Sequence, residues 1–108
     1  MLYNRSMCAD GQIIRSRSNA GLKRMRAVLA GRERGVLVLE GERLVRDAIR
    51  LGCPLEGLFV GDDHPELLDS LGGEGSLVES ALLQQASGLK TSPGVMALAP
   101  VPRALTID

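Results

Sequence analysis

The chain has 108 residues, which is enough for one small domain and too few for a second hydrophobic core. Apolar residues make up 44% and charged residues 24%, a balance typical of a globular protein rather than a disordered one. No apolar stretch approaches the roughly 20 residues needed to cross a bilayer, and residues 1–11 lack the apolar segment of a secretory signal. We therefore expect a soluble, cytoplasmic protein with no membrane contact.

The net charge of zero hides an asymmetry between the two halves of the chain. Residues 1–50 hold 11 basic and 5 acidic side chains, a charge of +6, whereas residues 51–108 hold 2 basic and 8 acidic ones, a charge of −6. Such asymmetry is typical of a protein that presents one surface to a polyanion. The alternative is that solvated faces of opposite charge simply segregate along the chain.

Few residues are suited to metal binding or nucleophilic catalysis. Cys8 and Cys53 form no Cys-x-x-Cys pair, which excludes a cysteine-based zinc site and argues against a disulfide framework. The single histidine, His64, precedes a proline and is expected at the exposed start of a helix. With no Trp, one Tyr and one Phe, the core must be aliphatic, and stacking of bases on aromatic side chains is largely excluded.

Hydrophobic periodicity predicts four elements in the first half of the chain. They are a short strand at 12–14, a helix at 18–30, a buried strand at 36–39 and a helix at 44–51. Ser18 is the expected N-cap of the first helix, and Gly31 is expected to end it in the left-handed conformation that glycine adopts freely. Gly52 is expected to close the second helix in the same way.

The second half predicts shorter pieces in the same alternation. They are a strand at 58–60, a short helix at 64–71, a strand at 76–78, a helix at 80–87 and a strand at 94–99. Asp62 or Asp63 is the expected cap of the short helix, and Ser80 is that of the next helix. Alternating strands and helices predict an α/β fold in which helices cover both faces of a central sheet. The domain is expected to span 12–99, with a loose tail at 1–11 and, from Pro100, an extended linker at 100–108.

Basic residues recur on the outward side of both predicted helices of the first half. Arg43, Arg46 and Arg50 fall within about 60° of one another, opposite the apolar residues of their helix. Asn19, Lys23 and Arg26 form a similar stripe on the earlier helix, with Arg15 and Arg17 ahead of it and Arg32 and Arg34 behind it. Arginine matches phosphate oxygens with paired hydrogen bonds, so the set predicts a surface that contacts a nucleic-acid backbone. The alternative is that each stripe is a solvated helix face, paired locally with Glu33, Glu42 and Asp47.

A second candidate contact is the segment 87–94, between the last helix and the last strand. It combines glycines with hydroxyl side chains and the lysine of the second half, so that Lys90, Thr91 and Ser92 are candidate RNA contacts. The alternative is a plain connecting turn.

Motifs for catalysis are missing from the sequence. It contains no phosphate-binding GxxxxGK[ST], no GxGxxG after a strand and no HExxH. Glu40, Glu42 and Asp47 lie close together in sequence but without a histidine or a metal motif, so we favour structural roles for them. Glu40, at the end of a predicted strand, is expected to anchor a neighbouring arginine or backbone group.

An ordered set of short motifs spans about residues 13–100. It comprises Ser16-Arg17-Ser18-Asn19, Lys23, Leu29, Arg32-Glu33-Arg34, Leu39-Glu40-Gly41-Glu42-Arg43-Leu44-Val45 and Pro93-Gly94-Val95-Met96-Ala97. The set resembles the N-terminal substrate-binding domain of the SpoU (TrmH-type) RNA 2′-O-ribose methyltransferases. Ala20 stands where that family has a proline, and Thr91-Ser92 where it often has a Gln or His.

The resemblance implies a three-layer α/β/α sandwich with a mixed sheet, similar to kink-turn-binding ribosomal proteins. It also implies that the domain grips structured RNA, with ribosomal RNA favoured over transfer RNA, through Arg17, Lys23, Arg34 and Arg43. In that family a separate knotted domain binds S-adenosylmethionine, methylates the ribose and forms a homodimer. Residues 105–108 resemble the start of that domain, so we expect the catalytic domain to be absent from this chain. By itself the chain is then expected to bind no cofactor and to methylate nothing.

Two other functions remain open at this point. The chain could be a stand-alone kink-turn RNA-binding protein. It could also be a protein-interaction or dimerisation module, whose arginines pair with an acidic partner or with the acidic half of its own chain.

Overall fold

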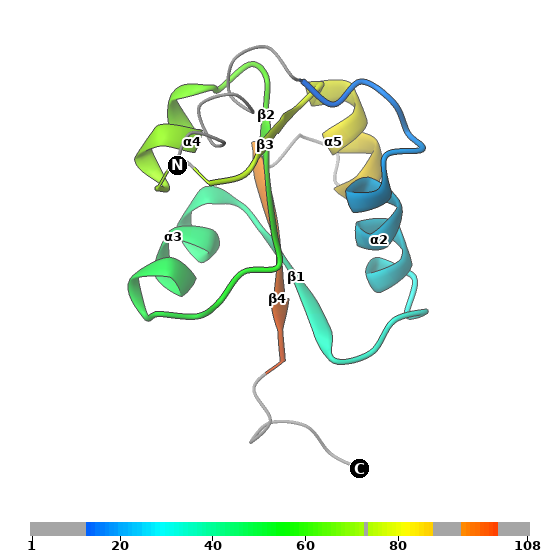
Figure 1. The fold of residues 1–108 in the computed structure, drawn as a ribbon, viewed down its shortest axis with the longest axis horizontal. Helices are drawn as coiled ribbons and strands as arrows, with labels where there is room; N and C mark the ends of the chain where they lie inside the picture. The colour runs from blue at the N-terminus through cyan, green and yellow to red at the C-terminus, as the bar shows by residue number, and fades with distance from the viewer. Residues whose placement is uncertain (1–12, 73, 88–93, 102–108) are drawn as a thin grey trace, which may run out of the picture.

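A computed structural model of the chain describes residues 13–72, 74–87 and 94–101. Strands and helices alternate along these ranges (Figure 1). The elements are α2 (Ala20–Leu29), β1 (Val36–Glu40), α3 (Glu42–Arg50), β2 (Gly57–Gly61), α4 (Glu66–Ser70), β3 (Ser76–Val78), α5 (Ser80–Ser87) and β4 (Val95–Pro100). The alternation predicted from the sequence is therefore confirmed, with boundaries that shift by at most two residues.

The four strands form one mixed sheet in the order β1-β4-β2-β3. β4 runs antiparallel to both of its neighbours, β1 and β2, whereas β2 and β3 are parallel. In Figure 1 the sheet is seen nearly edge-on, with α2 and α5 on one side and α3 and α4 on the other. The chain is thus a three-layer α/β/α sandwich, as predicted.

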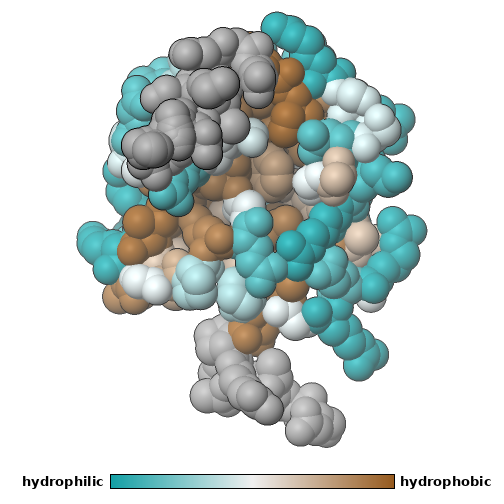
Figure 2. Space-filling model, viewed as in Figure 1, coloured by the Kyte–Doolittle hydropathy of each residue, from teal (hydrophilic) through white to brown (hydrophobic). Residues whose placement is uncertain are grey.

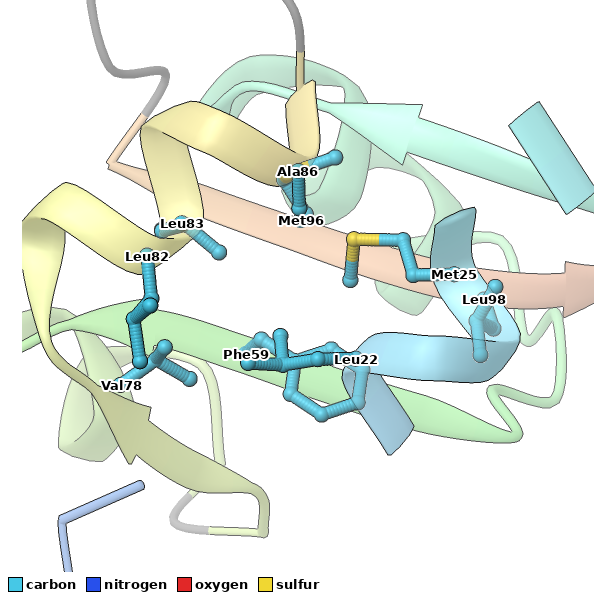
Figure 3. Close-up of a cluster of buried hydrophobic side chains, with 9 residues drawn as sticks. All are labelled: Leu22, Met25, Phe59, Val78, Leu82, Leu83, Ala86, Met96 and Leu98. Atoms are coloured by element: carbon cyan, nitrogen blue, oxygen red, sulfur yellow. The ribbon is translucent and has the colours of Figure 1, made fainter. Parts of the chain in front are cut away.

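Each face of the sheet carries its own hydrophobic cluster. The first cluster joins α2 and α5 to the sheet through residues such as Leu22, Phe59 and Met96 (Figure 3). The second joins α3 and α4 to the opposite face through residues such as Val45 and Leu68. Because every buried side chain of the described core is apolar, burial of hydrophobic surface drives the assembly of all three layers.

Helix α2 begins one residue later than the sequence suggested. The side chain of Asn19 accepts hydrogen bonds from the backbone N–H groups of Gly21 and Leu22, at 2.9 and 3.2 Å. The expected cap, Ser18, is exposed and instead shares a hydrogen bond with the Ser16 hydroxyl. Ser18 and Asn19 are both good capping residues, so sequence alone did not separate them. At the other end, Gly31 has the expected left-handed conformation, with φ of +79°.

The aspartate expected to cap α4 caps a different helix. Pro65 occupies the position before α4, and no side chain bonds to the first turn of that helix. The Asp62 carboxylate instead accepts a hydrogen bond from the backbone N–H of Ser80, at 3.1 Å. Ser80 is accordingly the first residue of α5 rather than its cap.

Strand β1 is an edge strand, which the sequence did not predict. Its aliphatic run indicated a buried strand, but β4 pairs with one side of it, and no strand among the described residues pairs with the other; Leu37 is 47% exposed. The end of β4 also differs from expectation, because Pro100 belongs to the strand and pairs with Val36. The backbone N–H of Val101 donates to Gly35, so the ordered domain continues past the predicted limit at residue 99.

The short strand expected at 12–14 is present as a single parallel bridge between Ile14 and Val78. The predicted tail at 1–11 and the linker beyond Val101 lie outside the described residues. Within the described ranges, no helix is both long enough and apolar enough to span a membrane.

The observed cap leads to a direct test of the start of α2. Asn19→Ala removes both side-chain hydrogen bonds and is expected to lower the free energy of unfolding by about 1 kcal/mol, measured by urea denaturation. Ser18→Ala is the matched control and is expected to change stability by less than about 0.5 kcal/mol. Equal losses in the two variants would contradict the assignment of Asn19 as the cap.

Candidate nucleic-acid interface

The predicted basic residues divide into those paired with carboxylates and those that are not. Ion pairs join Arg15 to Glu79, Arg24 to Glu33 and Glu56, Arg46 to Glu42, and Arg50 to Asp47. Two of these links, from Arg15 and from Arg24 to Glu56, connect the basic half of the chain to its acidic half. Part of the charge asymmetry is therefore neutralised inside the domain.

Arg24 holds the strongest of these networks. Its guanidinium donates to both carboxylate oxygens of Glu33, at 2.7 to 3.1 Å, and to Glu56 at 2.6 Å. Hydrogen bonding to Glu33 and then to Glu56 raises the pKa of Arg24, and the hydrogen bond from Arg24 lowers the pKa of Glu33. The network ties α2 to the segments before β1 and before β2, so Arg24 has a structural role.

The predicted stripe on α3 is largely committed to local contacts. Arg46 donates to Glu42 one turn earlier and to the Ser70 hydroxyl at the end of α4, the latter at 2.9 Å. Arg50 donates to Asp47 at 2.6 Å, although its side chain is 72% exposed. Of the three stripe residues, Arg43 is the one that has no side-chain partner among the described residues.

Exposed cations without a carboxylate partner form the candidate site. Within the described ranges, five predicted residues are exposed and have no hydrogen bond or ion pair from their side chains: Arg17, Lys23, Arg32, Arg34 and Arg43. We call this set the unpaired cations. Such groups are the ones available to a phosphate backbone, since no internal contact must be broken before they bind.

The remaining predicted contacts have partial or local roles. Arg26 donates to the backbone carbonyl of Arg17 at 2.6 Å, which fixes the turn before α2. The Asn19 oxygen is engaged in the helix cap described above. Lys90, Thr91 and Ser92 lie outside the described residues.

The unpaired cations do not lie on one helix face. Lys23 lies on α2, whereas Arg43 lies on α3 in the opposite layer, so the prediction that the two helix stripes make one surface is wrong. Arg32 and Arg34 precede β1, and Arg43 follows it, which places these cations around the two ends of the edge strand. In Figure 2 hydrophilic side chains gather on the right, the side of α2 in Figure 1, and apolar surface is visible on the left, the side of α3.

Glu40 does not anchor an arginine as expected. Its Oε1 atom is buried and has no hydrogen-bond partner, and within the described residues no ion pair involves Glu40.

Groups that could support catalysis are sparse in this part of the chain. No cluster of metal-ligating side chains is present among the described residues. His64 is exposed, as predicted, and lies 3.6 Å from a Glu66 oxygen, while Cys53 is a free and exposed thiol.

The Arg24 network is the feature that sequence reasoning missed. Arg24 and Glu33 are nine positions apart, outside the three- and four-residue spacings of helical ion pairs, and Glu56 is more distant still. Only the fold brings these three side chains together, and no local pattern marks them.

Comparison with solved structures places the fold among RNA 2′-O-ribose methyltransferases, so the predicted resemblance and fold class are confirmed. The crystal structure of an RNA 2′-O ribose methyltransferase matches with a TM-score of 0.64 and 27% sequence identity, over 88% of this chain and 39% of that one. No model of a known protein family matches the sequence, and no curated protein does.

Two further structures come from Sinorhizobium meliloti. An rRNA methyltransferase matches with a TM-score of 0.63 at 21% identity, over 84% of this chain and 38% of that chain. An rRNA methyltransferase with bound AdoMet matches with a TM-score of 0.61 at 21% identity, over 83% of this chain and 37% of that chain. The chain thus spans less than two fifths of the length of each of these two proteins. At 21% sequence identity, the structural similarity is evidence of a shared fold only.

The Arg24 network leads to a pH-dependence test. Arg24 lowers the pKa of Glu33 from its ordinary value of 4.5, so the stability that this carboxylate contributes is fully present above pH 4.5 and is lost as the pH falls through the lowered pKa. Glu33→Gln is therefore expected to unfold at lower urea concentration than the parent chain at neutral pH. The difference should shrink in acid.

Asp69→Asn is the control for this test, because Asp69 is an exposed carboxylate with no side-chain partner in the described ranges. Its effect is expected to be smaller than that of Glu33→Gln at neutral pH. A Glu33→Gln difference that stays constant down to strongly acidic pH would contradict the network.

Proposed function

We propose that the chain is an RNA-recognition domain of an S-adenosylmethionine-dependent RNA 2′-O-ribose methyltransferase, with ribosomal RNA as its substrate. The observation that supports this most is the combination of a methyltransferase-like fold with five exposed cations that lack internal partners. In this proposal, the domain formed by this chain binds the RNA. The proposal assigns the cofactor, the methyl transfer and the homodimer interface to a catalytic domain outside residues 1–108.

The domain limits form part of the proposal. Residues 12–101 would make the RNA-binding unit, preceded by a tail at 1–11 and followed by a linker that leads into the catalytic domain. The limit at 101 is later than the sequence predicted, since Val101 still bonds to the segment before β1.

The unpaired cations would bind RNA by neutralising phosphates of its backbone. Each cation that neutralises a phosphate releases counterions, which contributes about −0.7 to −0.9 to the slope of log K against log salt concentration. If four or five of the unpaired cations engage, the slope is roughly −3 to −4. Binding from this source is weak at physiological salt, with a dissociation constant of roughly 10⁻⁴ to 10⁻⁶ M, so specificity requires further contacts.

Salt-dependent binding of a ribosomal RNA hairpin tests the proposal. Lys23→Gln and Arg34→Gln are each expected to weaken binding several-fold and to reduce the magnitude of the salt slope by about 0.7 to 0.9, measured by fluorescence anisotropy. Arg50→Gln is the matched control: it removes the same charge from an exposed arginine, but one that Asp47 already holds. It is expected to change neither quantity.

Two results would overturn the proposal. One is the absence of RNA binding at low salt. The other is an equal loss in Arg50→Gln and Lys23→Gln, since this would mean that only net charge matters. A transfer RNA measured in parallel distinguishes the two RNA classes, and tighter binding of the transfer RNA would contradict the choice of ribosomal RNA.

A further inference from the structure

Two of the unpaired cations lie at the end of the sheet where β1 begins. Arg32 and Arg34 shortly precede this strand, and both are exposed. The carbonyl of Gly35, next to them, accepts a hydrogen bond at 2.9 Å from the backbone N–H of Val101, which follows the last residue of β4. Because β1 and β4 are antiparallel, this hydrogen bond marks one end of the sheet. We call Arg32 and Arg34 the entry pair.

The other three unpaired cations lie toward the opposite end of the sheet. The strands β1, β2 and β3 all run in the same direction, so their last residues share this end. Arg43 is the second residue of α3, which begins just after β1 ends. Arg17 follows Ile14, which forms a bridge with Val78 at the end of β3, and Lys23 lies in the first half of α2, which leads back toward the start of β1. We call Arg17, Lys23 and Arg43 the exit group.

The entry pair and the exit group are too far apart to hold one small anion. Gly35 and Gly41 flank the five residues of β1. Since a strand rises about 3.3 Å per residue, these two glycines are about 20 Å apart. At physiological salt the Debye length is about 8 Å, so exposed charges at this separation are screened from each other. An anion bound at one end of β1 is therefore not attracted by the cations at the other end.

The charge asymmetry of the chain corresponds to an asymmetry across the sheet. β1 and β3 form its two edges, and α2 and α3, from the basic half, both pack against β1. Helix α4 connects the parallel strands β2 and β3 and packs over them, with the exposed carboxylates of Glu66 and Asp69. A long polyanion is therefore attracted to the β1 side of the domain and repelled from the β3 side.

The described surface offers no aromatic side chain on which unpaired bases could stack. Proteins that bind single strands use such stacking in addition to a basic groove. Within the described ranges, Phe59 is the one Phe, Tyr or Trp residue, and it is 6% exposed and part of the core. Double-stranded RNA is recognised mostly by its shape and its phosphates, which requires no stacking. The surface thus favours a double helix over a single strand.

We infer that one RNA double helix spans the entry pair and the exit group, along the β1 side of the domain. This contact rests on the proposed RNA binding and narrows its ligand to a stem that is long enough to reach both ends of β1. Phosphates of one strand of a duplex are about 3.4 Å apart along its axis, so about 20 Å corresponds to at least about six base pairs. A shorter stem engages one set of cations only, and the exit group, which has more cations, holds it.

Two RNA hairpins that differ only in stem length test this contact, with the full chain as the protein. Their stems have about 3 and about 12 base pairs, roughly 10 and 40 Å, under the same small loop. For the parent chain, fluorescence anisotropy is expected to give a slope of log K against log salt that is steeper by about 1.8 for the long stem, because the entry pair adds two phosphate contacts. The double variant Arg32→Gln/Arg34→Gln is expected to lose this difference. At about 0.1 M salt it should bind the long stem about tenfold or more weakly, and the short stem as the parent does.

The double variant Arg15→Gln/Arg50→Gln is the matched control, because it also removes two charges, but from exposed arginines that carboxylates already hold. It is expected to keep the dependence on stem length, and circular dichroism verifies that each variant is folded. Equal slopes for the two stems, or an equal loss on both stems in Arg32→Gln/Arg34→Gln, would overturn the spanning contact and leave RNA binding in place. An unstructured single strand that binds as tightly as the long hairpin of the same nucleotide number would also overturn it. Absence of binding to both hairpins at low salt would instead contradict the proposed function.

Discussion

The insertion of β4 between β1 and β2 is the constraint on which the rest of the structure depends. Residues Val95–Ala99 are all buried, and they alternate between the two hydrophobic clusters, with Met96 and Leu98 on one face and Val95 and Ala97 on the other. Because the last strand of the domain occupies the middle of the sheet, β1 is displaced to its edge. The two helices that flank β1 in sequence, α2 and α3, then cover opposite faces.

This arrangement explains how the basic half of the chain is used. Arg24 is held by Glu33 and Glu56 and ties α2 to the segments before β1 and β2, whereas Arg46 is held by Glu42 of its own helix and donates to Ser70 of α4. Those that surround the edge strand, such as Arg34 and Arg43, have no such neighbours among the described residues. The separation has two sources: Arg24 meets carboxylates that the fold brings to it, whereas Arg46 and Arg50 meet carboxylates one turn away on their own helix.

The order and type of the elements were predictable because each depends on local pattern. The aliphatic run of β1, the helical spacing on α2 and the glycines that end the helices are short-range signals. Three features were not predictable, and each depends on long-range contacts. Strand order placed β1 at an edge, the fold turned Asp62 toward α5 instead of α4, and the Arg24 network joined residues from three separate segments. For the candidate site, charge and spacing identified the cations, but only the fold separates the paired ones from the unpaired.

In the described part of the chain, β1 lies at the edge of the sheet and has cations near both of its ends, so two binding properties occur in one place. Backbone groups that point outward favour a strand, whereas exposed guanidinium groups favour phosphates. On an isolated edge these properties would compete, because a partner strand covers the side chains near it.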